Sequence, residues 1–111
     1  MPTIDKTTFE ELKQMSGADF IDELIDAFVE DGPNMINQMQ TALAIQDAEA
    51  FRRNAHSLKS NANTFGAMEL SVLAKELEVM GREKNLNVGN RLEVLKEEFQ
   101  RVAEELKGMR V

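Results

Sequence analysis

The apolar residues of this 111-residue chain recur at helical spacing along almost its whole length, and no strand-like alternation persists. Only two prolines occur, Pro2 and Pro33. Because apolar side chains spaced three and four residues apart form one buried stripe on a helix, the pattern predicts an all-α protein. The loops between the helical segments are short, which favours antiparallel neighbours and hence an up-down helix bundle.

Capping and breaking residues set the expected bounds of the first helices. A short helix is expected near residues 8–15 and a second over about residues 18–30. The run Asp31-Gly32-Pro33 predicts a break, with Pro33 in the first turn of a third helix. Asp47 is the expected N-cap of a fourth helix, and Gly66 is expected to end it.

Two further helices are expected in the second half of the chain. The first ends at a loop that Gly81 and residues 85–90 mark. The last helix shows the steadiest repeat, and at under three heptads we interpret it as the core face of a bundle rather than a coiled coil. Its apolar residues are Val88, Leu92, Leu95, Phe99, Val102 and Leu106.

Length and composition indicate one compact domain over residues 1–111. The chain has no cysteine, which excludes a disulfide framework, a thiol nucleophile and a cysteine metal site. The formal net charge of -7 argues against nucleic acid as a partner. The first residues show neither a basic leader nor an apolar run, and no apolar run is long enough for a membrane helix, so we expect no signal peptide and a cytoplasmic protein.

A helical wheel of the fourth helix places His56, the only histidine, on the solvent side. Arg52, Lys59 and Asn63 share that side, at i−4, i+3 and i+7 from His56. Ser60 lies at i+4, one turn after His56. The middle of the apolar arc is about 140° from His56, and the arc itself is about 80° wide. It consists of Phe51, Ala55, Leu58, Ala62 and Phe65.

This arrangement suits a phosphoryl acceptor. Near pH 7 a histidine ring is largely neutral, and its unprotonated nitrogen is a nucleophile. Lys59 can place an ammonium near the phosphoryl oxygens, Arg52 can assist from the other side, and the small Ser60 leaves room for a partner's active site. The alternative is a surface histidine without chemistry. A metal site is not expected, because the chain has no second histidine and no cysteine.

The segment from Ala55 to Ser60, followed by Gly66-Ala67, resembles the signature of the histidine-containing phosphotransfer (HPt) family. The signature combines a histidine with a leucine two residues on, a lysine three on, a small residue four on and a glycine about ten on. The resemblance extends over roughly residues 18–107, including 47–50 and 77–82. One departure is Ser60, where the family usually has glycine.

The resemblance implies a four-helix antiparallel bundle with an additional short N-terminal helix. It implies that His56 accepts a phosphoryl group from a receiver-domain aspartate and passes it to another receiver. Response-regulator receiver domains and a hybrid sensor histidine kinase are the implied partners. Mg²⁺ would belong to the receiver, so the chain would need no cofactor and have no kinase activity. The sequence has no glycine-rich phosphate loop, which agrees with the expectation that the chain has no kinase activity.

The segment 20–29 carries more apolar surface than a single core stripe requires, about 180° against somewhat over 100°. One interpretation is packing against the first helix through Phe9 and Leu12. The other is a surface that docks a receiver domain beside His56. The docking hypothesis assigns four residues to this surface: Phe20, Ile21, Leu24 and Ile25.

Two other functions are compatible with the same residues. The chain could be an interaction module that binds a receiver or kinase without carrying phosphate, as the departure at Ser60 suggests. It could also be the phosphoacceptor domain of a chemotaxis-type histidine kinase, in which only the donor differs. Under all three hypotheses we expect a monomer.

Overall fold

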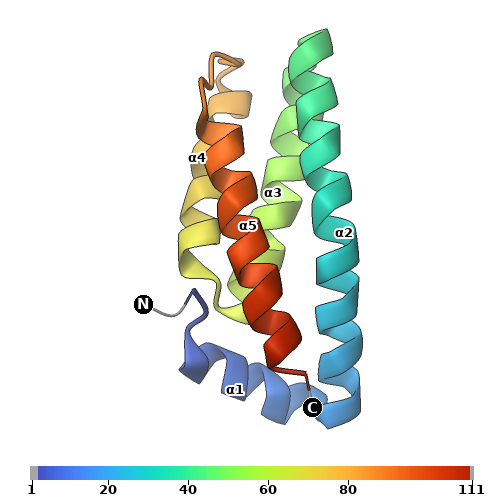
Figure 1. The fold of residues 1–111 in the computed structure, drawn as a ribbon. Helices are drawn as coiled ribbons and strands as arrows, with labels where there is room; N and C mark the ends of the chain where they lie inside the picture. Colours follow the sequence, from blue (N-terminus) through green and yellow to red (C-terminus); the bar gives the residue numbers. More distant parts are fainter. Residues whose placement is uncertain (1–2, 111) are drawn as a thin grey trace.

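The computed structural model describes residues 3–110 and, within them, contains five helices and no strand. α2 to α5 lie side by side along the long axis of the molecule, and α1 lies across one end (Figure 1). The all-α bundle with an additional short N-terminal helix is therefore confirmed. The helices are α1 (Lys6–Ser16), α2 (Ala18–Ile45), α3 (Ala48–Phe65), α4 (Met68–Arg82) and α5 (Arg91–Gly108).

The predicted break at residues 31–33 is wrong, because α2 continues through Pro33 without interruption. An interior proline lacks an N–H and crowds the carbonyl four residues earlier, at a cost of about 3 kcal/mol. Both halves of α2 nevertheless bury side chains in the same core, Phe28 before the proline and Ile36 after it. Burial on both sides of the proline therefore outweighs the local preference of the sequence for a break.

Gly32 lies on the buried face of α2 and makes room for Phe99 of α5. A Cβ atom at this position would lie 2.2 Å from the Phe99 ring. We therefore expect Gly32→Ala to lower the free energy of unfolding by about 1–3 kcal/mol, despite the better helix propensity of alanine. Urea unfolding followed by circular dichroism would measure the change. In the control Gly108→Ala the added methyl meets open space, so an equal loss there would contradict this explanation.

The ends of α3 lie where the sequence predicts them. The Asp47 side chain accepts a hydrogen bond from the Ala50 N–H at 3.1 Å, which caps the helix start. Gly66 ends the helix with a φ of 80°, in the left-handed region that glycine tolerates. The Asp5 N–H donates to the Gly66 carbonyl at 2.8 Å, so this turn also fixes the start of α1. The helix that carries His56 is thus held at both ends.

α4 ends at Arg82, one residue after the Gly81 that the sequence indicates as the start of a loop, and Gly81 itself lies where α4 packs on α3. A Cβ atom at Gly81 would lie 3.1 Å from the Arg52 Cα atom, so only a residue without a side chain permits this spacing comfortably. Arg52 lies one turn before His56 and Gly81 one turn after Glu78. The close approach of the two backbones therefore brings Glu78 to the histidine.

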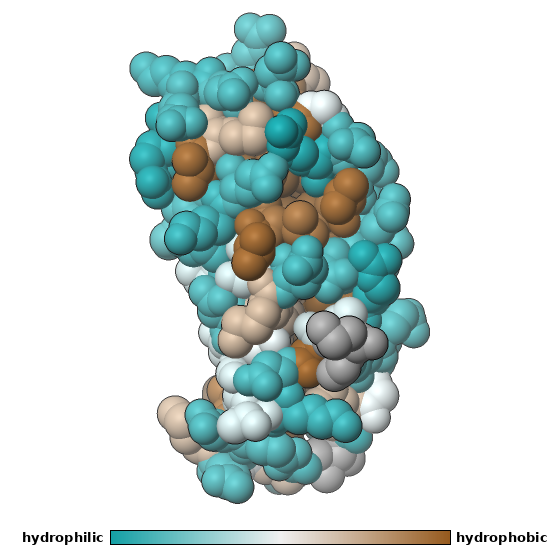
Figure 2. Space-filling model, turned by 90° about the vertical axis from the view of Figure 1, so that its left-hand side faces the viewer, coloured by the Kyte–Doolittle hydropathy of each residue, from teal (hydrophilic) through white to brown (hydrophobic). Residues whose placement is uncertain are grey.

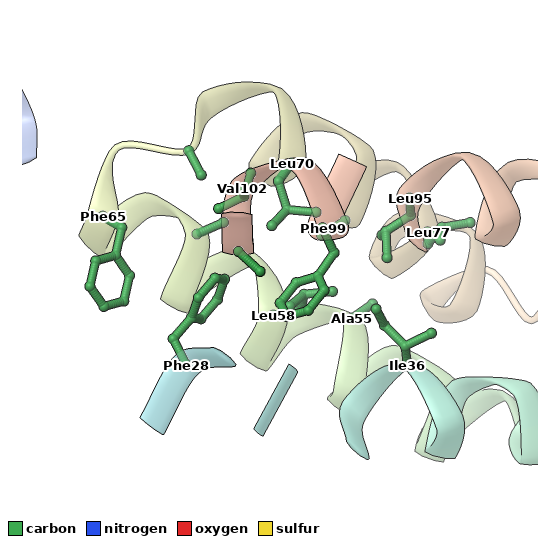
Figure 3. Close-up of a cluster of buried hydrophobic side chains, with 14 of the residues drawn as sticks. Phe28, Ile36, Ala55, Leu58, Phe65, Leu70, Leu77, Leu95, Phe99 and Val102 are labelled. Atoms are coloured by element: carbon green, nitrogen blue, oxygen red, sulfur yellow. The ribbon is translucent and has the colours of Figure 1, made fainter. Parts of the chain in front are cut away.

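The core runs between the four long helices (Figure 3). Phe28 of α2 lies against both Phe65 of α3 and Phe99 of α5, with ring centroids 5.1 Å and 5.3 Å apart. Val88 is buried but precedes α5, which begins at Arg91, so the last helix starts later than the periodicity predicts. None of the helices that the structure describes is long and apolar enough to cross a membrane.

Candidate functional site

His56 projects from the middle of α3 toward solvent, as the helical wheel predicts. Its side chain is 51% exposed, yet one edge of the ring faces α4. There the Nδ1 atom lies 2.7 Å from the Oε2 atom of Glu78. One ring nitrogen is thus occupied by the protein, and the half-exposed ring remains accessible to a partner.

Glu78 is the centre of a charged cluster between α3 and α4. Its side chain is only 3% exposed, and its Oε1 atom lies 2.7 Å from the Lys59 ammonium. The Arg82 guanidinium is 3.4 Å from Oε2, the oxygen that also contacts His56. Burial by itself would raise the pKa of Glu78, but hydrogen bonds from Lys59 and His56 outweigh burial and lower it. Glu78 is therefore a carboxylate at neutral pH.

The charge of Glu78 decides which nitrogen of His56 carries the proton. A carboxylate has no proton and can only accept hydrogen bonds. The 2.7 Å contact therefore requires an N–H at Nδ1 of His56. In the neutral ring, Nε2 then has a free lone pair.

The structure assembles only part of the predicted site. Lys59 joins His56 through their shared partner Glu78. Arg52 instead pairs with Glu49, through Nε at 3.1 Å and Nη2 at 2.5 Å. This hydrogen bond raises the pKa of Arg52 and lowers the pKa of Glu49. Arg52 is thus engaged outside the cluster around Glu78.

The two small polar residues expected near the phosphoryl group lie on the exposed face of α3. Ser60 and Asn63 are both exposed. Within residues 3–110, neither side chain forms a hydrogen bond. The structure leaves both of them accessible to a partner but does not join them to the Glu78 cluster.

The predicted docking surface on α2 is wrong for two of its four residues. Ile21 and Ile25 are fully buried, because they face the core of the bundle, and Leu24 is partly buried against it. Only Phe20, at 51%, is well exposed. Phe9 of α1 is buried, in agreement with the interpretation that α1 covers part of this surface.

Phe20 also lies far from His56 along the bundle. Phe28 is level with Phe65, since their ring centroids are 5.1 Å apart, and the two helices are antiparallel. At the usual rise per residue this places Phe20 about 25 Å along the axis from the level of His56. Other apolar side chains are also exposed, among them Met68 and Val72 of α4. Figure 2 shows apolar patches near the middle of the α4 side, surrounded by hydrophilic residues. The structure therefore does not single out the start of α2.

Sequence reasoning missed Glu78 and Arg82 as members of the site. The pair Leu77-Glu78 and the following Gly81-Arg82 entered only as part of the family resemblance. Glu78 borders the apolar stripe of α4, a signal that is common on amphipathic helices and does not point to a partner. The pairing becomes visible only when the register of α4 against α3 is known.

The lowered pKa of Glu78 predicts a specific loss of stability in acid. Above its ordinary pKa of 4.5 the ionised group stabilises the fold, and this contribution is lost as the pH falls through the lower folded-state pKa. We expect the unfolding free energy of the wild type to fall more steeply below about pH 5 than that of Glu78→Gln. Urea unfolding at several pH values would measure this difference. Parallel curves would contradict the prediction, and Glu97→Gln, on an exposed part of α5, is the control.

No cluster of three or more His, Cys, Asp or Glu side chains that could hold a metal ion occurs among the residues that the structure describes.

The comparisons with known proteins identify the family. The model of the Hpt domain matches residues 23–105. The crystal structure of the histidine-containing phosphotransfer protein B (HptB) from Pseudomonas aeruginosa PAO1 superimposes with a TM-score of 0.88, at 28% sequence identity. That match covers 98% of this chain and 95% of HptB. The chain belongs to the Hpt domain family and is a histidine phosphotransfer module of two-component systems.

A curated relative is the sensor protein TorS of Escherichia coli (strain K12), which is 30% identical over 76 residues. The matched part covers 68% of this chain but only 8% of TorS. The relative is thus a far longer protein, of which this chain resembles one segment.

Proposed function

We propose that His56 accepts a phosphoryl group on Nε2 from an aspartyl phosphate of a receiver domain and passes it to the aspartate of another receiver. The single observation that carries this proposal is the half-exposed imidazole whose Nδ1 is held at 2.7 Å by buried Glu78. This contact directs the free lone pair to the other ring nitrogen. Family membership supports receiver domains and histidine kinases as the partners.

The transfer step exchanges one bond for another. The Nε2 lone pair of His56 attacks phosphorus in line, the Nε2–P bond forms, and the bond from phosphorus to the aspartate oxygen breaks. The aspartate leaves as a carboxylate, and the imidazole becomes positively charged with its proton still on Nδ1. Glu78 stabilises this charge through the hydrogen bond that it already accepts.

In this proposal the protein contributes orientation and charge, and the receiver contributes the rest. The Mg²⁺ ion is expected on the receiver, and the chain is a carrier without kinase activity of its own. Because the ring is oriented before the partner arrives, no rearrangement of His56 is required at the moment of transfer.

The test uses receiver domains from the organism that encodes the chain. Each is phosphorylated on its aspartate, freed from the small donor and mixed with this protein. We expect radiolabel to leave one receiver and appear on the chain in an acid-labile, base-stable form, and then to move to a second receiver. A receiver that is labelled and binds the chain, yet transfers nothing, would contradict the proposal and favour a binding module.

A further inference from the structure

We infer that Arg82 of α4, and not Arg52 of α3, provides the guanidinium that binds the phosphoryl oxygens on His56. The inference rests on the proposed function and deepens it. A phosphoryl group on Nε2 brings close to two negative charges and three acceptor oxygens to the surface. Cations that are close and free to turn toward it are needed, and three side chains around the site are candidates.

Arg52 is already paired with Glu49 rather than with Glu78. Both its Nε and Nη2 atoms donate to the Glu49 carboxylate, one turn earlier on the same helix. A planar guanidinium that forms two parallel bonds to a carboxylate is at its preferred geometry. Turning Arg52 toward His56 would break both bonds.

Lys59 is committed to Glu78. Its side chain is only 22% exposed, and its ammonium lies 2.7 Å from Oε1 of the buried carboxylate. Withdrawing the ammonium would leave Glu78 buried with much less compensation for its charge, which is expensive. Lys59 therefore acts mainly as a positioning residue, which keeps Glu78 ionised and in contact with His56.

Arg82 is the cation that can move. Its side chain is 61% exposed, and its 3.4 Å contact with Glu78 is longer than the 2.7–2.9 Å typical of strong charge-assisted hydrogen bonds. It approaches the same oxygen that accepts from His56, so the guanidinium is already beside the ring. When Arg82 turns outward, Glu78 keeps Lys59 and His56 as partners.

The guanidinium also has the right shape for this role. Its fork of N–H groups matches two oxygens of a phosphoryl group, which a single ammonium cannot do. Arg82 would pair with the phosphoryl oxygens as they leave the receiver and would stabilise the phosphohistidine afterwards. One charge-assisted pair of this kind corresponds to about a tenfold change in rate.

The test compares Arg82→Ala with Arg52→Ala in transfer from a phosphorylated receiver under single-turnover conditions. We expect Arg82→Ala to slow transfer about tenfold and to shorten the lifetime of the phosphohistidine, and Arg52→Ala to stay within about twofold of the wild type. Imidazole ¹⁵N NMR separates binding from positioning. The His56 proton should stay on Nδ1 in Arg82→Ala, and the tautomer should be altered in Lys59→Ala.

Three results would overturn the inference. Arg82→Ala could transfer at the wild-type rate, Arg52→Ala could be impaired as much as Arg82→Ala, or the proton of His56 could leave Nδ1 in Arg82→Ala. Each of these, with an active wild type, leaves the proposed function standing. A wild-type protein that takes up no phosphoryl group from any receiver overturns the proposed function, and this inference with it.

Discussion

We expect His56→Gln to take up no phosphoryl group at all while remaining folded. The glutamine amide has no nucleophilic nitrogen, so the bond to phosphorus cannot form. The side chain is 51% exposed, and the amide N–H can still donate to Glu78, so no buried carboxylate loses its partner. The change in unfolding free energy should therefore stay within about 0.5–1 kcal/mol. Intact mass after treatment with phosphoramidate measures uptake, and urea unfolding measures stability.

Ser57→Ala is the matched control for this variant. Ser57 is the neighbouring exposed residue of α3 and carries a hydroxyl that could be phosphorylated instead. We expect the control to gain one acid-labile phosphoryl group, as the wild type does. Uptake by His56→Gln, or its loss in Ser57→Ala alone, would show that the acceptor is not the histidine. Unfolding of His56→Gln would contradict its exposed placement.

Glu78→Gln should have the second largest effect, a transfer rate lowered by about 10–100-fold with His56 still present. The neutral amide no longer stabilises the positive charge that the ring gains, and a charge-assisted hydrogen bond is worth about 1.5–3 kcal/mol. An amide can also donate to Nδ1, so the proton is no longer held there. Single-turnover transfer from a phosphorylated receiver measures the rate, and ¹⁵N NMR of His56 reports the tautomer.

Glu76→Gln is the control for the glutamate variant. Glu76 is on the same helix, but its side chain is 51% exposed and pairs with Arg91 of α5. We expect transfer by this variant to match the wild type. If Glu78→Gln transferred at the wild-type rate in a folded protein, the role assigned to the buried carboxylate would be wrong. Urea unfolding of both variants would show whether either substitution prevents folding.

The parts of the fold that depend on local chemistry could be predicted from the sequence. Asp47 and Gly66 cap α3 as expected, because capping is decided by one side chain or one φ angle. The exposed placement of His56 followed from the wheel of a single helix. Both features need no knowledge of the neighbouring helices.

The features that depend on neighbouring helices could not be predicted in this way. Pro33 indicates a break locally, and only packing on both sides of it keeps α2 continuous. Gly81 indicates the end of α4 to within one residue, but the sequence does not show that Gly81 also permits the close contact with α3. The burial of Ile21 and Ile25 likewise depends on which faces the other helices cover.

Which residues form the site also could not be predicted from one helix alone. The wheel grouped Arg52 with His56 because it considered one helix, and it could not include Glu78 or Arg82 from α4. The residue that orients the imidazole is thus 22 positions away in the sequence. The antiparallel register of α3 and α4 brings the two together, and the periodicity of one helix does not contain that register.

The most direct test of the central claim is NMR of the chain labelled with ¹⁵N and phosphorylated by phosphoramidate. The coupling between ³¹P and the ring nitrogens of His56 identifies the nitrogen that carries phosphorus. We expect one phosphoryl group per chain, bonded to Nε2, with the proton on Nδ1 beside Glu78. Phosphorus on Nδ1, on another residue, or nowhere on the folded chain with every donor would contradict the assignment of His56 and its orientation by Glu78.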